Sequence, residues 1–329
     1  MKDEQADTML PVSLSPMTTL IFMGSPQFAV PTLEALARDY TVLAVYTQPD
    51  KPAGRGKVLT AVPVKQWAAT RGLPVYQPRS FRKDPAVIDQ LRALKPDLIV
   101  VAAYGLILPQ AALDVPPLGC VNVHGSILPR HRGAAPIPSA ILAGDAATGI
   151  TIMQLDAGMD TGPLLAVAHE PIRSTDTTAS LGERLAQVGA RLLIETLPGY
   201  LSGAITPQAQ PGDGITYSPK ISKADAQIDW TRPAIELDRA VRAYSPWPGA
   251  FTGWNGQLLK ILKTGIRDQG SGAAGTVIRL ADGAIGVATG DGVIELIEIQ
   301  LAGRKAMSAR DFVRGQPSLI KAQFTRLGA

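Results

Sequence analysis

Apolar runs and amphipathic segments alternate along the chain from residue 19 to about residue 197. Short runs rich in Val, Ile, Leu and Ala predict buried strands at 19–23, 42–47, 98–102, 120–123 and 149–154. Apolar residues at helical spacing predict helices at 31–38, 62–70, 84–94, 134–142 and 176–197. This alternation is typical of an α/β domain. We therefore expect a doubly wound, mostly parallel, Rossmann-like sheet with helices on both faces.

The pattern changes after residue 200. Residues 202–213 are rich in Gly, Pro, Gln and Ser, which is typical of a linker. Beyond it the pattern predicts a helix at 233–242 and short strands at 258–264, 275–279, 283–288 and 292–300. Gly-rich turns between these strands favour hairpins, so we expect a small, antiparallel, OB-like β-barrel. The predicted order is a disordered extension (1–17), an α/β domain (18–200), a linker (201–219) and a C-terminal domain (220–329).

Length and composition indicate a globular protein. With 329 residues and 46% hydrophobic content, the chain can form the cores of two domains. The longest apolar run, from Leu98 to Leu108, is interrupted by Tyr104 and Gly105 and is too short to span a bilayer. Acidic residues near the N-terminus are unlike a signal peptide. We therefore expect a cytoplasmic protein that does not enter a membrane.

Cysteine and histidine are scarce. The single cysteine, Cys120, excludes an internal disulfide, and its place in a predicted strand favours a core residue over a catalytic thiol. With only His124, His131 and His169 available, we expect no metal site. The net charge of +4 suits acidic small molecules as well as nucleic acid.

The end of the fourth predicted strand carries two polar residues among apolar ones. Asn122 and His124 are two positions apart, so they share one side of the strand at the end where α/β sheets bind ligands. A lone buried histidine is more often a core residue than a catalyst, but the pairing with an asparagine favours chemistry. A Gly-rich turn at 155–162 can return a carboxylate, from Asp156 or Asp160, to the imidazole.

An Asn, a His and an Asp suit acyl transfer to an amine. Asn122 can donate an N–H to the oxyanion of the tetrahedral state, and His124 can donate to the same oxygen or carry the proton. The Asp would hold the imidazole, favour its charged form and order a water that carries the proton. Spacing alone does not separate Asp156 from Asp160, because a carboxylate in an Asp-x-Gly turn commonly caps its own backbone.

Other motifs allow two interpretations. The turn Gly24-Ser25-Pro26 resembles the start of a dinucleotide-binding loop, but the G-x-G-x-x-G pattern is incomplete and a structural turn is favoured. Arg130 and Arg132 could bind anionic groups of a ligand, or they could pack near a helix N-terminus.

Several blocks in a fixed order resemble the methionyl-tRNA formyltransferase family over about residues 18–315. They are IFMGSPQFA at 21–29, TQPDKPAGRG at 47–56, AYGLILP at 103–109, NVH at 122–124, RGAAP at 132–136, the turn of Asp160, SKADAQIDW at 222–230, PWP at 246–248 and GRKAM at 303–307. The resemblance implies transfer of a formyl group from 10-formyltetrahydrofolate to the α-amine of methionyl initiator tRNA, with no metal.

The resemblance also implies roles for particular residues. It makes Asn122, His124 and Asp160 the catalytic residues, and so favours Asp160 over Asp156. The folate motif of the family falls on Ser126, Ile127, Leu128 and Pro129, where Ile127 replaces a leucine of equal volume.

Basic residues are the expected tRNA contacts. Three charges in a loop more often mark a solvated surface, but the resemblance implies that the loop holding Lys51, Arg55 and Lys57 enters the acceptor stem. Lys220 and Lys223 can extend this basic track, and the C-terminal barrel would add backbone affinity. If Arg130 and Arg132 bind a ligand, the resemblance implies folate or RNA phosphates.

Two other functions remain possible from sequence. A folate-dependent enzyme could formylate a small amine such as glycinamide ribonucleotide or a nucleotide amino sugar, although such an enzyme does not need the basic loop and the C-terminal domain. A catalytically silent RNA-binding or folate-binding protein would not need a buried acid/base set. We expect a monomer.

Overall fold

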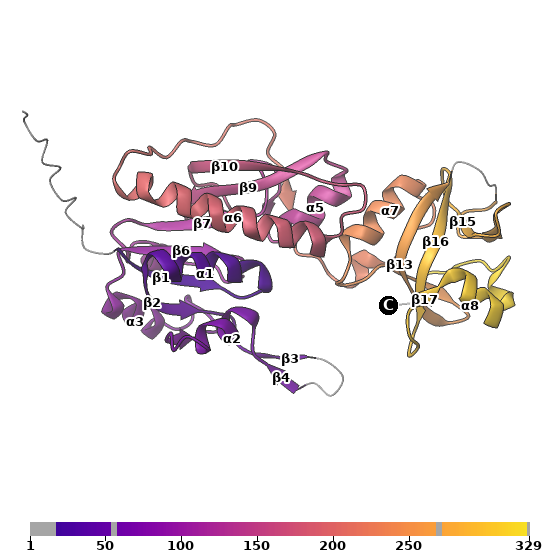
Figure 1. Ribbon diagram of the computed structural model, residues 1–329, viewed down its shortest axis with the longest axis horizontal. Helices are drawn as coiled ribbons and strands as arrows, with labels where there is room; N and C mark the ends of the chain where they lie inside the picture. Colours follow the sequence, from indigo (N-terminus) through magenta and orange to yellow (C-terminus); the bar gives the residue numbers. More distant parts are fainter. Residues whose placement is uncertain (1–17, 54–57, 268–271, 328–329) are drawn as a thin grey trace, which may run out of the picture. The chain divides into compact units, whose positions relative to one another are not determined.

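The computed structural model describes residues 18–53, 58–267 and 272–327 (Figure 1). The predicted extension at 1–17 lies outside this range. The chain divides into two compact units, Met1–Val121 and Asn122–Ala329. The division falls inside strand β7 (Cys120–His124), so β7 contributes residues to both units.

Parallel strands form the centre of the first unit. β1 (Thr19–Gly24) pairs in parallel with β2 (Thr41–Tyr46) and β6 (Leu98–Ala102), and β2 pairs in parallel with β5 (Val75–Tyr76). Every residue of β6 is buried, as expected for a parallel strand that is covered on both faces. The start of β7 lies next to β6, where Ile99 N donates to Gly119 O (3.2 Å). The predicted parallel sheet is confirmed.

Helices follow these strands as the alternation predicts. The first unit contains η1 (Gln27–Ala29), α1 (Val30–Asp39), α2 (Pro63–Ala69), α3 (Ala86–Leu94) and α4 (Gln110–Leu113). In α1 the residues Leu33 and Leu36 are fully buried, one helical turn apart. The helix predicted at 31–38 is therefore confirmed, and its apolar residues lie on the buried face.

The second unit continues from β7 with the order β10-β9-β7. β9 (Ala147–Gln154) was predicted, but β10 (Leu164–Pro171), which pairs with it in antiparallel fashion, was not. β10 is half exposed, which is typical of an edge strand, although its residues 164–168 are all apolar. This strand makes the sheet mixed, in agreement with a mostly parallel prediction.

A long helix covers β9 and β10. α6 (Thr178–Leu201) packs against both strands, and the shorter α5 (Pro136–Ala143) precedes them in the chain (Figure 1). The N-terminus of α6 has a capping box, in which Thr177 Oγ1 accepts from Ser180 N (3.2 Å) and Ser180 Oγ accepts from Thr177 N (3.0 Å). The polar residues at this position therefore cap the helix predicted at 176–197.

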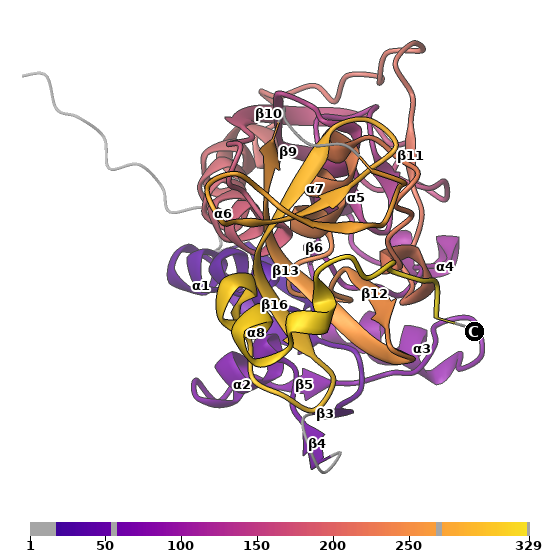
Figure 2. The same ribbon diagram turned by 90° about the vertical axis from the view of Figure 1, so that its right-hand side faces the viewer.

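An antiparallel barrel-like domain follows, as predicted. Its strands lie in the order β12-β13-β16-β15-β14, with β17 paired to β16, and the long strands β13 and β16 are prominent in Figure 2. Its elements are η2 (Ala224–Ala226), α7 (Ala234–Ala243), β12 (Phe251–Trp254), β13 (Gln257–Arg267), β14 (Val277–Arg279), β15 (Ile285–Ala288), β16 (Val293–Leu301), β17 (Met307–Ser308), α8 (Ala309–Gly315) and η3 (Pro317–Leu319).

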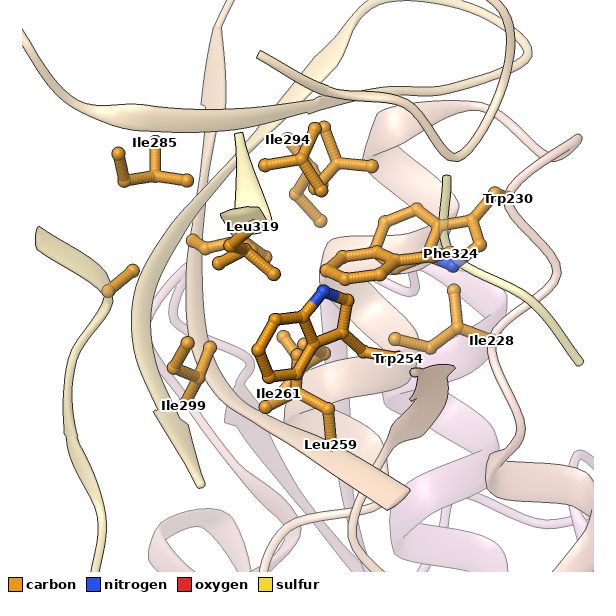
Figure 3. Packing of buried hydrophobic residues seen from close by; sticks show 14 of the residues in the cluster. Ile228, Trp230, Trp254, Leu259, Ile261, Ile285, Ile294, Ile299, Leu319 and Phe324 are labelled. Carbon is orange, nitrogen blue, oxygen red and sulfur yellow. The ribbon is translucent and has the colours of Figure 1, made fainter. Parts of the chain in front are cut away.

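This domain has its own aromatic core (Figure 3). The rings of Trp230 and Phe324 are 5.3 Å apart, and those of Trp254 and Phe312 meet edge to face at 5.4 Å. The indole N–H of Trp230 donates to Thr252 Oγ1 (3.0 Å), which satisfies its polar atom inside the core. A separate core of this kind is what an independent domain requires.

The segment that was predicted as a linker is hydrogen-bonded to the region after β7. β11 (Tyr217–Ser218) pairs in parallel with β8 (Arg132–Gly133). Arg132 N donates to Thr216 O, and Ala134 N donates to Ser218 O, each over 2.9 Å. Composition predicts a linker here but does not reveal these long-range bonds.

Candidate active site

β7 presents Asn122 and His124 on the same side of one strand. Both side chains are buried, with exposed fractions of 8% and 5%. The amide of Asn122 makes no hydrogen bond within residues 18–53, 58–267 and 272–327. Its N–H donors are therefore available to a substrate oxygen, which is the role that the sequence predicted.

The imidazole of His124 has one bonded nitrogen and one open nitrogen. Nε2 lies 3.1 Å from the carbonyl oxygen of His131. Because a carbonyl can only accept, Nε2 carries the hydrogen in the neutral ring and Nδ1 keeps the lone pair. Nδ1 lies 3.7 Å from Asp160 Oδ2, too far for a hydrogen bond. Nδ1 is therefore the nitrogen that can take up a proton.

Burial and charge act on His124 in opposite directions. Burial lowers the pKa of His124 below its ordinary value, while Asp160 and the carbonyl of His131 raise it. Burial is the larger cause, so the ring is neutral near pH 7. A proton gained at Nδ1 would be stabilised by the carboxylate that faces it. This arrangement suits a general base.

Asp160 is held in place from the neighbouring segment. Its Oδ2 accepts from Gly133 N over 2.7 Å, and its backbone lies in the left-handed region, with φ of +53°. Gly133 has φ of +118°, and a Cβ there would lie 2.6 Å from Ser218 O. Only glycine fits this close approach, and it directs the N–H at the carboxylate.

Asp156 has a different environment in the same turn. It is exposed, and its Oδ1 accepts from Gly158 N (3.0 Å) and from Thr161 Oγ1 (2.8 Å). These bonds close the turn on itself. The structure therefore brings Asp160 to His124 and leaves Asp156 as a turn cap, a distinction that spacing could not make.

The segment after β7 is a tight turn. Ser126 is fully buried, and its hydroxyl donates to Arg130 O (2.6 Å). Thr151 Oγ1 donates to Ser126 O (2.7 Å) and accepts from Leu128 N (3.1 Å). The Leu128–Pro129 peptide bond is cis. The predicted folate residues, Ser126, Ile127, Leu128 and Pro129, are thus fixed directly beyond His124.

The basic residues of the next segment have partners within the protein. Asp145 accepts from Arg130 Nη2 (2.6 Å) and lies 2.7 Å from Nε2 of His131. Arg132 donates instead to Gln210 Oε1, from Nε (3.1 Å) and from Nη2 (2.6 Å). Both arginines therefore have intramolecular partners, and contacts with folate or RNA stay a prediction.

Cys120 and the first-strand turn have structural environments. Cys120 is 1% exposed, and burial raises the pKa of its thiol to about 12, so it is no nucleophile.

Three of the family-like blocks meet at the carboxyl ends of β1, β2 and β6. Gln48 N donates to Ser25 Oγ (2.9 Å), and Gln48 Nε2 donates to Tyr104 O (3.1 Å).

The predicted tRNA contacts are partly described. Lys51 is exposed on β3 (Lys51–Ala53), which forms an antiparallel hairpin with β4 (Val58–Thr60). Arg55 and Lys57 lie outside the described residues. Lys220 and Lys223 are exposed and form no ion pair with the described carboxylates.

Sequence reasoning missed Gln210, Thr216 and Ser218. Gln210 bonds to the turn of Asp160, while Thr216 Oγ1 accepts from His131 N (2.8 Å) and Ser218 Oγ donates to His131 O (3.2 Å). All three fall in the predicted linker, where polar residues are ordinary. No local pattern could have separated them from solvent-exposed neighbours.

Neither a metal-binding group nor a membrane-spanning helix is found in the described part of the chain. No group of three or more His, Cys, Asp and Glu side chains is arranged to hold a metal ion there. Among the same residues, no helix is long and apolar enough to cross a membrane.

Comparison with known proteins defines the class to which this fold and site belong. Residues 18–197 match the family described as formyl transferase, and residues 220–317 match the formyl transferase C-terminal domain. The two matches cover the sheet domain with its Asn, His and Asp side chains and most of the barrel-like domain. They define an enzyme that transfers formyl groups.

Sequence relatives narrow the class. The methionyl-tRNA formyltransferase of Ruegeria pomeroyi is 50% identical over 299 residues, which cover 91% of this chain and 97% of that protein. The protein of the same name from Myxococcus xanthus is 49% identical over 296 residues, which cover 90% of this chain and 94% of its own. The chain belongs to the methionyl-tRNA formyltransferase family.

A solved structure shows the same fold at low identity. HypX from Aquifex aeolicus in complex with tetrahydrofolic acid has a TM-score of 0.61 and 19% identity to this chain. The match covers 91% of this chain and 47% of HypX. The fold is therefore found in a protein that binds a folate.

Proposed function

We propose that this chain transfers the formyl group of 10-formyltetrahydrofolate to the α-amine of methionine esterified to initiator tRNA. One observation carries the chemistry: the open Nδ1 of buried His124 faces Asp160, next to the free amide of Asn122. The acceptor is inferred from the relatives at about half identity, which are named for it. We place this reaction in the cytoplasm.

Asn122 and His124 of β7 can stabilise the negative oxygen and accept the proton that the amine loses. The amine nitrogen forms a bond to the formyl carbon, and Asn122 donates an N–H to the oxygen, which becomes negative. His124 Nδ1 takes the proton that the amine loses, and Asp160 stabilises the resulting imidazolium. The bond from the formyl carbon to the folate nitrogen then breaks, and the proton passes from His124 to that nitrogen.

The acceptor amine suits a base of modest strength. An α-amino group has a pKa near 7.7–8.0, so a substantial fraction is neutral at physiological pH. The enzyme then needs mainly to orient the amine and to stabilise the tetrahedral state. A neutral imidazole with a lowered pKa meets this need without a metal ion.

The folate is proposed to lie against the turn formed by Ser126, Ile127, Leu128 and Pro129. The polar atoms of Ser126 and Leu128 that are named above are bonded inside the protein, so this turn offers shape and apolar contact. Ile127 is partly exposed and can contact a ring system. The Asn122 amide would then meet the formyl oxygen.

The tRNA is proposed to bind basic residues that come before and after the candidate catalytic residues in the sequence. Lys51, Arg55 and Lys57 come from the first unit, and Lys220 and Lys223 precede the C-terminal domain. Their contacts would be with phosphates, so we expect binding to weaken steeply as salt increases. The chain is proposed to act as a monomer.

One assay tests the reaction and its acceptor together. The protein is given 10-formyltetrahydrofolate with a radiolabelled formyl group, and methionyl initiator tRNA, methionyl elongator tRNA and glycinamide ribonucleotide are supplied in parallel. Label should enter the initiator tRNA far faster than the other two. Equal labelling of the elongator tRNA would remove the initiator preference, and labelling of glycinamide ribonucleotide alone would overturn the proposed acceptor.

A further inference from the structure

Gln210 connects the turn of Asp160 to the segment that follows β7. Its Nε2 donates to the carbonyl oxygens of Asp160 and Gly162, each over 2.8 Å. Its Oε1 accepts twice from Arg132, over 3.1 and 2.6 Å. A guanidinium cannot accept and a carbonyl cannot donate, so these partners also determine which way the amide points. Both N–H donors of the amide bond to the Asp160 turn, and its oxygen accepts twice from the segment after β7.

The position of the Asp160 carboxylate depends on the turn that carries it. Asp160 has a left-handed backbone with φ of +53°, a conformation that is unfavourable for a residue with a side chain. The carboxylate is 3.7 Å from His124 Nδ1, so no direct hydrogen bond holds the two together. The bonds from Gly133 N and from Gln210 hold Asp160 instead.

Arg132 holds the side chain of Gln210 in place through two hydrogen bonds. The residue is 7% exposed, and its guanidinium forms no ion pair with any carboxylate in the described ranges. A buried cation needs hydrogen-bond acceptors, and Gln210 Oε1 is the acceptor recorded for two of its N–H groups. Arg132 lies between His131, whose carbonyl binds His124, and Gly133, whose N–H binds Asp160.

We propose that Gln210 is a positioning residue that sets the distance between the Asp160 carboxylate and Nδ1 of His124. It would act through Asp160 and would not touch the substrates. Its catalytic consequence rests on the proposed function. A residue between the two domain-sized matches thus takes part in building the acid/base pair.

A neighbouring glutamine provides a matched control. Gln208 lies two residues earlier and is exposed, and its Nε2 donates only to the nearby Thr206 O (3.0 Å) among the described residues. Methionine has nearly the same length as glutamine but cannot form these bonds. Gln210→Met should lower kcat for formyl transfer on the order of ten- to a hundredfold, with small changes in KM, because reacting groups are sensitive to displacements of about 1 Å. Gln208→Met should match the wild type.

A double-mutant cycle tests whether Gln210 acts through Asp160. If it does, Gln210→Met should reduce kcat much less in an Asp160→Asn background than in the wild type. Equal fold-losses in the two backgrounds would show an independent effect and overturn the proposal. An unchanged kcat in Gln210→Met would also overturn it.

A measurement without turnover separates this inference from the proposed function. The ring signals of His124 are identified by their loss in His124→Ala, and their pH titration is followed by NMR. Because Asp160 raises the pKa of His124, a displaced carboxylate should move the midpoint to lower pH in Gln210→Met and not in Gln208→Met. An unchanged midpoint in a folded Gln210→Met protein would refute the positioning role. Failure of the wild type to formylate methionyl-tRNA would refute the function and leave this titration informative.

Discussion

Two histidine–carboxylate pairs, His124 with Asp160 and His131 with Asp145, are nearly equal in burial. In the first pair, the side chains of His124 and Asp160 are 5% and 17% exposed. In the second, those of His131 and Asp145 are 7% and 18% exposed. The pairs differ in distance, because Nδ1 of His124 is 3.7 Å from its carboxylate, while Nε2 of His131 is 2.7 Å from its own.

The carboxylate of the closer pair has a second cationic partner. Asp145 also binds the guanidinium of Arg130, so a permanent cation already balances its charge. Asp160 pairs with no lysine or arginine in the described part of the chain, and its charge can act on an imidazolium. The pair suited to proton transfer is the one with an open ring nitrogen and a carboxylate that no lysine or arginine of the described residues neutralises. Short distance alone would have favoured the other pair.

Removal of the imidazole of His124 should have the largest effect. His124→Ala should reduce the single-turnover rate of formyl transfer on the order of a hundred- to ten-thousandfold, since it removes the general base. Circular dichroism and the thermal midpoint should show a folded protein. A near-normal single-turnover rate would refute the role of His124.

Removal of the charge of Asp160 should have the next largest effect and should change the pH dependence. Asp160→Asn should lower kcat on the order of a hundredfold, because the imidazolium loses its stabilising partner. The pKa of His124 should fall further below its ordinary value, so the acidic limb of the rate–pH profile should move to lower pH. A limb that stays in place or moves to higher pH would contradict the geometry.

The same change in the second pair should alter stability rather than chemistry. Asp145→Asn leaves His131 and Arg130 with a weaker acceptor and should lower the free energy of unfolding by about 1–3 kcal/mol. We expect kcat to stay within a small factor of wild type and the acidic limb to stay in place. Chemical denaturation and the pH profile check the two parts, and a moved limb would mean that the pairs are coupled.

The smallest effect is expected at the other carboxylate of the Asp160 turn. Asp156→Ala removes bonds to Gly158 and Thr161 in an exposed turn and should cost about 0.5–1 kcal/mol of stability. The rate of formyl transfer should be close to that of wild type. A loss as large as that of Asp160→Asn would return Asp156 to the list of catalytic residues.

Patterns of hydrophobic residues predicted most of the framework. The parallel strands and the capped helix α6 were predicted because long buried segments carry strong apolar periodicity. The edge strand β10 was missed despite its apolar residues at 164–168, and β11 was missed because a two-residue strand leaves little pattern. The hairpin of β3 and β4 was taken for a loop because Lys, Pro and Gly in it are typical of turns.

The candidate site was predictable where it lies on a strand. Asn122 and His124 share a side because alternation along a strand is a local property. The orientation of Nδ1, the choice of Asp160 and the proposed role of Gln210 depend on bonds between residues far apart in the chain, such as Gly133 N to Asp160 and Arg132 to Gln210. Such bonds leave no trace in local composition.

The sequence alone therefore determined the fold class, the strand that carries the candidate catalytic residues Asn122 and His124, and the family resemblance, since these depend on residue type and spacing. Only the tertiary structure decided which histidine and which carboxylate form an open pair. The reason is physical. Whether the ring nitrogens of a buried imidazole are hydrogen-bonded or open depends on every partner within hydrogen-bond distance. Those partners come from segments that only folding brings together.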